Sequence, residues 1–440
     1  MRDLLILGII IAALPFAIAH TWIAVILWTW ISLMNPHKLA FGFILNAPIA
    51  AVAAGAALLS MVFTRDKLRM PWTPPVIVLL LLVLWMCLTT VFAIDPIGSS
   101  SQLNKVMKIQ IMTVVALIAL QTRKHIEMFI WIIVLSIGYY GFKGGIFTIL
   151  TGGGSRVWGP PGSFIEENNA LAVAVIMTIP LINYLRMVAT RLVFRLGLLA
   201  LMLLCTLSAL GSQSRGAFLA ISAMGLVLWY RSERKVVNGV AIAVIAAGLI
   251  AFMPSSWEQR MRTIETYQQD NSAQSRLGAW RFCANVANHR LLGGGFDLYT
   301  PLNYAVYAPA ESVGTPVAHS IYFSILGEHG YGGLFLFLLL WWLTFRCAAR
   351  IRRQARDRPE MAWTYHLAGM CQVSMVGYLA GGAFLQLAYF DLPYNILVVL
   401  VVTDRWIREG GWHQEKVGAF GSGKPITAAA APHPAANKLT

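Results

Sequence analysis

A histidine, an acidic residue and several glycines lie close together in the stretch AHSIYFSILGEHGYGGL, residues 318–334, within an otherwise apolar run. His319 opens the run, and Glu328 and His329 follow nine and ten residues later. Ionisable side chains are costly in a lipid bilayer, so such groups indicate a functional site. A histidine with its ordinary pKa of ~6.5 can serve as a neutral base near pH 7.

Arg215, in GSQSRGAFLAI, opens a second apolar run. The start of a helix favours anions, and an arginine beside it adds positive charge for a diphosphate. Such a pair suits transfer from a lipid-linked sugar diphosphate, in which the protein stabilises the leaving diphosphate and deprotonates an acceptor hydroxyl. His319 as a simple helix cap, and Arg215 as the partner of a carboxylate, are the structural alternatives.

No cofactor or metal is expected for this chemistry. The chain contains neither DxD nor HExxH, and the external histidines His289 and His319 stand 30 residues apart, which is poor spacing for zinc ligands. The sequence therefore predicts metal-independent catalysis.

The composition predicts an all-α, polytopic integral membrane protein. Of the 440 residues, 58% are hydrophobic and 12% are charged, and a crossing needs about 20 apolar residues. Residues 3–34 form one crossing or a short pair broken near Pro15 and His20, and we prefer one uncleaved crossing, for about 12 transmembrane helices in all. The other eleven apolar runs are 44–64, 75–94, 107–121, 126–150, 169–185, 192–210, 216–230, 236–253, 320–345, 362–388 and 394–407.

Basic residues collect in alternate loops, and the positive-inside rule makes those loops cytoplasmic. They are Arg65, Lys67, Arg69, Arg123, Lys124, Arg186, Arg191, Arg195, Arg231, Arg234, Lys235, Arg346, Arg350, Arg352, Arg353, Arg356, Arg358, Arg405 and Arg408. The net charge of +15 thus reflects topology, and no nucleic-acid partner is expected. Arg215 and His319 fall together on the opposite, extracytoplasmic side.

We divide the chain into four regions. Residues 1–253 hold the N-terminal transmembrane helices, 254–319 a large periplasmic loop, 320–410 the C-terminal transmembrane helices, and 411–440 a disordered cytoplasmic tail rich in Gly, Ala and Pro. In the loop we expect two helices over the membrane face, in 255–277 and 276–292, the second ended by Gly293–Gly295.

Further basic residues outside the cytoplasmic loops are candidate phosphate ligands or members of ion pairs. Arg276, Arg281 and Arg290 belong to the large loop, Arg156 to the Gly- and Pro-rich loop 151–172, and Lys143 to an apolar run. Lys143 either extends to the interface or holds an anionic headgroup. Glu166 and Glu167 stand at the head of the next helix, where N-capping is a sufficient explanation.

Two short motifs carry a resemblance to a known family. His319-Ser320, nine residues, then Gly330-Tyr331-Gly332-Gly333 resembles the histidine signature of bacterial O-antigen ligases, and RGAFL, Arg215 to Leu219, is similar to their second element. The N-terminal NPHKLAFGF and the 151–172 loop resemble exosortase-associated O-glycosylation ligases of the same superfamily.

The resemblance implies an inverting glycosyltransferase of lipopolysaccharide biosynthesis in the bacterial inner membrane, with its active site facing the periplasm. It would move an O-antigen glycan from undecaprenyl diphosphate to a sugar hydroxyl of lipid A-core. His319 would be the base or would orient the acceptor, and Arg215 would bind the diphosphate. We add Arg290 as a second phosphate ligand, with Arg276 and Arg281 behind it.

The rest of the histidine motif is expected to support the site. Gly330, Tyr331 and Gly333 would shape the helix that carries His319. Glu328 and His329 would lie about 14–15 Å deeper along a straight helix, as supporting or packing groups.

Three alternatives remain at this stage. An O-antigen polymerase and a protein O-oligosaccharyltransferase would use the same donor, so the acceptor is open. A lipid-linked glycan transporter is less favoured, because the sequence shows no internal repeat and its polar residues gather at one face.

Overall fold

The computed structural model describes residues 2–232, 234–255, 271–309 and 314–414, and every regular element within them is a helix. Seven of these helices are long and apolar enough to cross a membrane, as in a polytopic membrane protein. They are α1 (Arg2–Ala19), α4 (Pro74–Val91), α5 (Pro96–Ala119), α6 (Arg123–Leu150), α7 (Asn168–Val188), α8 (Leu192–Gly211) and α14 (Ile321–Ala355).

Other helices complete the bundle. The longer ones are α2 (Thr21–Met34), α3 (Ile49–Phe63), α9 (Arg215–Tyr230), α10 (Lys235–Phe252), α15 (Ala362–Gly382) and α16 (Asp391–Arg408). Short pieces are η1 (Pro36–Leu39), η2 (Phe43–Asn46), η4 (Pro359–Met361) and α17 (Gly411–Gln414). Each of the eleven predicted apolar runs contains a helix, and the twelve crossings stay a prediction.

The N-terminal run forms two helices, α1 and α2, separated at His20, whose φ of −131° is extended. The break expected near His20 is therefore present, whereas Pro15 lies inside α1. The last described residues also differ from expectation, because α17 is helical where the tail was predicted to be disordered; residues 415–440 lie outside the described part.

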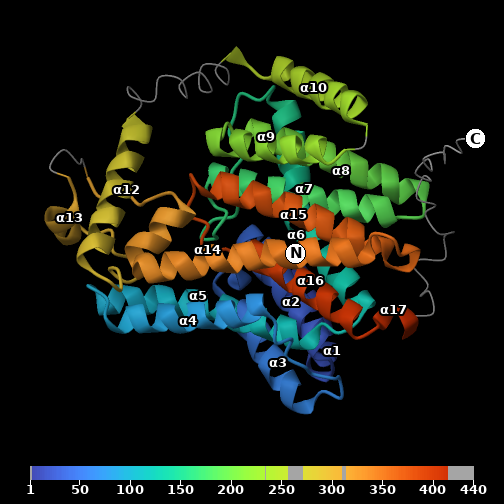
Figure 1. Ribbon diagram of the computed structural model, residues 1–440, viewed down its shortest axis with the longest axis horizontal. Coiled ribbons are helices and arrows are strands. Elements are labelled where there is room, and N and C mark those ends of the chain that lie inside the picture. The colour runs from blue at the N-terminus through green and yellow to red at the C-terminus, as the bar shows by residue number, and fades with distance from the viewer. Residues whose placement is uncertain (1, 233, 256–270, 310–313, 415–440) are drawn as a thin grey trace, which may run out of the picture.

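The long helices lie side by side, and glycines let some of them approach closely (Figure 1). Gly141 and Gly145 of α6 face α8, where an added Cβ would collide with Cys205 and with the backbone of Leu204. In lipid the hydrophobic effect does not drive helices together, and small residues allow the close van der Waals packing that does. This contact fixes α8, and with it the loop that leads into α9.

The predicted loop region contributes α12 (Asn271–His289) and α13 (Pro301–Tyr307), which gather at one end of the bundle (Figure 1). Helix α12 agrees with the second expected helix, and most of the first, 256–270, lies outside the described residues. Helix α13 was not predicted. Its start carries Pro301 and is capped by the Thr300 hydroxyl, which accepts a hydrogen bond from the N–H of Asn303.

Helix α14 is broken at Gly330, whose backbone lies at φ 65° and ψ −171°. Only glycine adopts this conformation readily. The carbonyls of Gly327 and Glu328, which would otherwise bond within the helix, accept the N–H groups of Gly294 and Gly295 at 2.8 and 2.9 Å. The glycine-rich turn thus ends a short first helix, 321–329, and the chain changes direction there (Figure 1).

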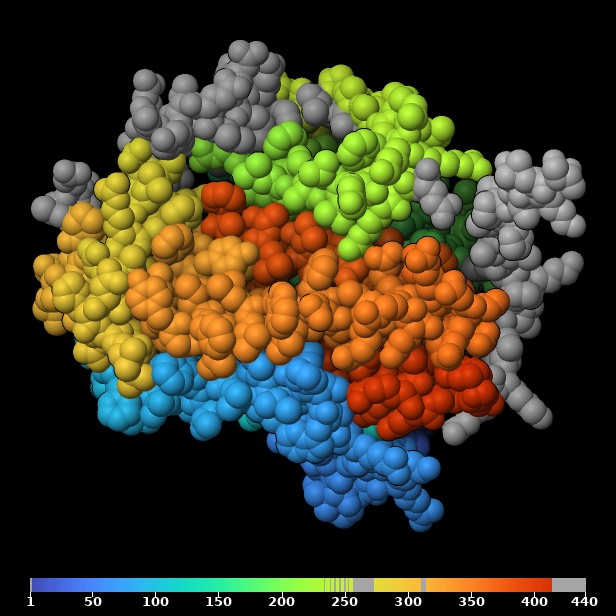
Figure 2. All heavy atoms as spheres, viewed as in Figure 1, coloured from blue at the N-terminus to red at the C-terminus, as the bar shows by residue number. Residues whose placement is uncertain are grey.

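This break corrects the expectation of one straight helix. The part after Gly330, residues 331–355, is about 37 Å long at 1.5 Å per residue, which is enough to span a bilayer alone. It crosses one face of the molecule as the orange band in Figure 2. Glu328 and His329 therefore lie where the spanning part begins, and not midway through it.

Candidate functional site

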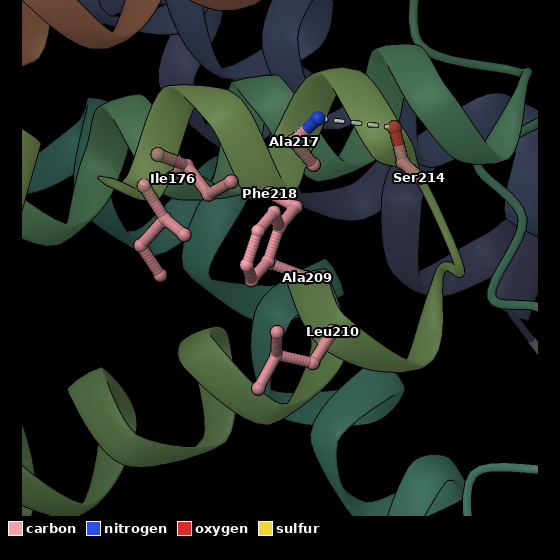
Figure 3. A pocket seen from close by; sticks show the side chains of 7 residues that line it. Ile176, Ala209, Leu210, Ser214, Ala217 and Phe218 are labelled. Carbon is pink, nitrogen blue, oxygen red and sulfur yellow. Dashed lines mark hydrogen bonds between the residues drawn. The ribbon is translucent and has the colours of Figure 1, made fainter. Parts of the chain in front are cut away.

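Arg215 is the first residue of α9 and follows a tightly held loop. The Ser214 hydroxyl caps the helix by accepting the N–H of Ala217 at 3.2 Å (Figure 3). Asn168, at the start of α7, donates its side-chain amide to the Ser212 carbonyl at 2.7 Å. Gln213 has a left-handed φ of 55° and donates to the Gly153 carbonyl at 3.2 Å. The 151–167 loop and α7 therefore fix where Arg215 emerges.

The space beneath this turn is apolar and small. Ile176, Ala209, Leu210 and Phe218 surround a cavity of about 10 Å³ (Figure 3). It has room for about one water molecule, so it is no substrate pocket. Leu219, the last residue of the RGAFL motif, is 39% exposed.

His319 precedes α14 in a strained conformation. Its φ of 44° lies in the left-handed region, which costs a non-glycine residue about 1–3 kcal/mol. Ser320 occupies the N-cap but makes no side-chain cap bond, and its buried hydroxyl has no hydrogen-bond partner among the described residues. Strain together with an unused buried hydroxyl is typical of a functional helix start.

Trp280 of α12 holds this start in place, and it was missed by the sequence analysis. Its indole N–H donates to the Ala318 carbonyl at 2.8 Å. Its ring stacks on Phe323 with centroids 4.8 Å apart and also meets Phe384 at 6.2 Å. The one available signal was its position four residues after Arg276, which puts both on one side of α12.

The starts of α9 and α14 meet at the same short segment, 381–384, at the end of α15. A Cβ on Gly216 would lie 3.5 Å from Phe384, and a Cβ on Gly382 would lie 2.7 Å from Ile321. Arg215 directly precedes Gly216 in the chain, and His319 lies two residues before Ile321. The fold thus brings the two predicted site elements together, although they are separated by more than 100 residues.

Two charged side chains act on His319. Burial lowers the pKa of His319 below 6.5, the nearby Glu167 carboxylate opposes this, and Arg276 adds to it. Glu167 stands at the N-cap of α7 without making a cap bond, so capping does not account for it. Glu166 instead accepts the N–H of Gly162 at 2.7 Å. The imidazole is therefore kept neutral near pH 7, as a base requires.

Arg290 lies at the opposite end of α12 from Arg276, about 21 Å along the helix. Its Nε donates to the Gly293 carbonyl at 3.0 Å, and its Nη2 donates to the Phe92 carbonyl at 2.7 Å. The guanidinium joins the glycine-rich turn to the end of α4. Arg281 is exposed on the intervening part of α12.

Lys143 and Arg156 are not brought to His319 by any contact that the structure shows. Lys143 is exposed on α6 beside Phe142 and Ile146, away from the glycines that face α8. Arg156 is exposed in the 151–167 loop.

A buried hydrogen-bonded chain occupies the far end of helix 321–329. Tyr389 bonds Glu328 Oε2 at 2.5 Å and His329 Nε2 at 2.8 Å, and Thr89 bonds His329 Nδ1 at 2.7 Å and the Met86 carbonyl at 3.0 Å. Tyr389 and Thr89 were not predicted. With one proton for each bond, the chain holds either a protonated Glu328 beside neutral His329 or the corresponding ion pair. In both cases Glu328 and His329 together carry no net charge.

The remaining motif residues pack around the break. The Tyr331 hydroxyl donates to Asn288 at 2.8 Å at the surface. Gly332 and Gly333 face Trp85, whose indole donates to the His329 carbonyl at 2.9 Å. These contacts attach α4 and α12 to the point where α14 changes direction.

Two protein families match parts of the chain that overlap at residues 170–190. A family of unknown function, DUF5935, matches residues 1–190, and the O-antigen ligase family matches residues 170–338. The match to the O-antigen ligase family shows that residues 170–338 are similar to that family. A search of the curated proteins finds no match for the chain.

The family comprises glycosyltransferase-like ligases and polymerases that use lipid-linked glycans. The region matched by the O-antigen ligase family contains Arg215, Trp280, His319 and the break at Gly330. Lys143 and Arg156 fall in the part matched by the family of unknown function.

Proposed function

We propose that the protein is a periplasm-facing O-antigen ligase of the bacterial inner membrane. It transfers a glycan from undecaprenyl diphosphate to a sugar hydroxyl of lipid A-core. The meeting of the α9 and α14 starts on segment 381–384 carries this proposal, because it joins a cationic helix start to a neutral histidine.

Arg215 and the first N–H groups of α9 receive the diphosphate, since both favour negative charge. As transfer proceeds, the bond between the sugar's anomeric carbon and the diphosphate oxygen breaks, and its electron pair stays on the diphosphate. Arg215 stabilises that charge more strongly in the transition state than in the substrate. No metal is needed for this stabilisation.

His319 takes the acceptor's proton. The acceptor oxygen attacks the opposite face of the anomeric carbon, so the configuration inverts, and the imidazole receives the hydroxyl proton as the new bond forms. Burial is the main cause that keeps the pKa of His319 low and the imidazole unprotonated before the reaction, and the nearby Arg276 adds to it.

Complementation with matched variants tests the proposal. The chain is expressed in Gram-negative cells that lack their own O-antigen ligase and carry a compatible core, beside His319→Ala, Arg215→Ala and the control His289→Ala at equal membrane levels. His289 is an exposed histidine at the end of α12. We expect wild type and His289→Ala to restore the lipopolysaccharide ladder and the other two to abolish it.

The alternatives give different products in the same cells. A polymerase would lengthen the lipid-linked glycan without attaching it to the core, and a protein O-oligosaccharyltransferase would attach it to membrane or periplasmic proteins. A transporter would tolerate His319→Ala. Full activity of His319→Ala would contradict the proposed site whatever the acceptor.

A further inference from the structure

A second polar site lies far along α14, at its last turns. A cleft of about 170 Å³ opens there between α14 and the start of α4, with Pro74, Pro75, Trp342, Arg346, Arg350 and Arg353 among its lining residues. The arginines follow one another at spacings of four and three residues and so share one face of the helix. Along α14 the cleft begins about 18 Å beyond the break at Gly330, and its arginines lie about 24 to 35 Å from the break, so it is separate from the proposed catalytic site.

The charge in this cleft is only partly compensated. Arg350 donates two hydrogen bonds of 2.9 Å to the carboxylate of Asp404. The same carboxylate also pairs with Arg408 at 3.0 Å, so one negative charge serves two guanidinium groups. Arg346 and Arg353 add further positive charge beside it. A phosphate group supplies the charge and the acceptor oxygens that such a set of arginines binds best.

An apolar track leads to the arginines. Arg346 lies over the ring of Trp342, 5.2 Å from its centroid. Trp342, Leu338 and Phe335 continue the same face of α14 and are 54%, 45% and 64% exposed. Helix α4 packs beside α14 and also exposes Leu81 and other aliphatic side chains. A tryptophan between apolar and cationic residues is typical of the membrane–water boundary.

We propose that this cleft binds the phosphate headgroup of an acidic membrane phospholipid, with an acyl chain lying along Trp342 and Leu338. The arginines belong to the loops that the charge distribution predicts to be cytoplasmic, so the lipid comes from the inner leaflet. A soluble phosphate shares the headgroup chemistry but would leave the apolar track unused. An acidic phospholipid therefore accounts for both the arginines of the cleft and the apolar track beside them.

The test compares two double variants of the full chain purified in detergent. Arg346→Gln/Arg353→Gln removes two cleft arginines, and the control Arg191→Gln/Arg195→Gln removes two exposed arginines at the start of α8. Each protein is titrated with dioleoyl-phosphatidylglycerol, with dioleoyl-phosphatidylcholine and with inorganic phosphate, and thermal unfolding reports binding. Retained lipid is extracted and measured by mass spectrometry.

We expect phosphatidylglycerol alone to stabilise the wild type and the control. The cleft variant should bind it about 30-fold more weakly, because each arginine contributes roughly fivefold to binding at a membrane surface. Equal losses in both variants would show general surface attraction and overturn the site. Stabilisation by inorganic phosphate that the cleft variant loses would assign a soluble anion instead. If the glutamine variant does not fold, Arg346→Lys/Arg353→Lys must keep the preference for phosphatidylglycerol.

Discussion

The two ends of helix 321–329 differ in how their polar groups are satisfied. At the start, His319 has a left-handed backbone, and the buried Ser320 hydroxyl lacks a partner among the described residues. At the end, Glu328 and His329 are completely enclosed and joined through Tyr389 and Thr89. Nine residues therefore separate a strained, incompletely bonded terminus from a fully bonded one.

The difference assigns different tasks to the two ends. Strain and unused hydrogen-bonding capacity are costly, and they persist where the surrounding structure imposes them. Trp280 holds the chain at the strained end, and the glycine-rich turn, Trp85 and Tyr389 hold the backbone and side chains of the bonded end. Residue type alone does not distinguish the strained end from the bonded end, since each carries one histidine.

The largest effect is expected at the strained end. His319→Gly should lower the transfer rate by about 10²–10⁴-fold, the usual contribution of a general base. Its thermal midpoint should not fall, because glycine adopts a positive φ without strain. Transfer rates on lipid-linked donor and melting curves in detergent measure both quantities. A large loss of stability with little loss of specific activity would reverse the assignment of this end.

The next largest effect is expected at the break. Gly330→Ala would force a Cβ into the Leu291 carbonyl and into a backbone conformation reserved for glycine. We expect a loss of about 2–4 kcal/mol in folding free energy, from strain and displaced packing together. Unfolding in detergent by denaturant provides the measurement.

Gly225→Ala is the matched control, since nothing lies within 4 Å of a Cβ there. It should be neutral or slightly stabilising in the middle of α9. If both substitutions were equally tolerated, the break would not be a structural requirement.

The helical segments were predictable from hydropathy, because each apolar run must satisfy its own backbone hydrogen bonds in lipid. The α9 and α14 starts were also identified from Arg215 and His319. The break was not, because glycine inside a helical pattern is common, and only the capping of Gly327 and Glu328 by a distant turn reveals its conformation.

The partners from other elements were equally hidden. Tyr389 contacts Glu328 across 61 positions, and Trp280 reaches Ala318 across 38. Neither belongs to a short motif, and each depends on how distant helices pack. The contacts of Arg290 were hidden as well, because its residue type suggested phosphate and gave no sign that it joins two backbone carbonyls. Its role as a phosphate ligand stays a prediction.

A smaller effect is expected within the bonded end. Tyr389→Phe removes the hydroxyl shared by Glu328 and His329 and leaves both buried groups short of a partner, at a cost of about 1–3 kcal/mol. Activity per folded molecule should be largely retained.

Tyr331→Phe is the control: it removes a surface hydrogen bond to Asn288 and should change stability by about 0.5 kcal/mol or less. Equal stabilities of the two variants would contradict the role of the buried chain as an anchor.

The smallest effect concerns the proton on His319. Its pKa is lowered below 6.5, so the catalytic rate should be constant near pH 7 and should fall only on acidification through that lowered pKa. Glu167 favours the protonated form and Arg276 disfavours it. Glu167→Gln should therefore move the acid limb of the kcat profile to lower pH, and Arg276→Gln should move it to higher pH. Glu166→Gln, which removes a carboxylate bonded to Gly162, should leave the limb in place. Opposite shifts of the acid limb in Glu167→Gln and Arg276→Gln would identify His319 as the titrating base. They would do so even if Arg276 also binds the donor, because weaker donor binding changes KM and does not move the two acid limbs in opposite directions. Shifts in the same direction would mean that another group controls the rate.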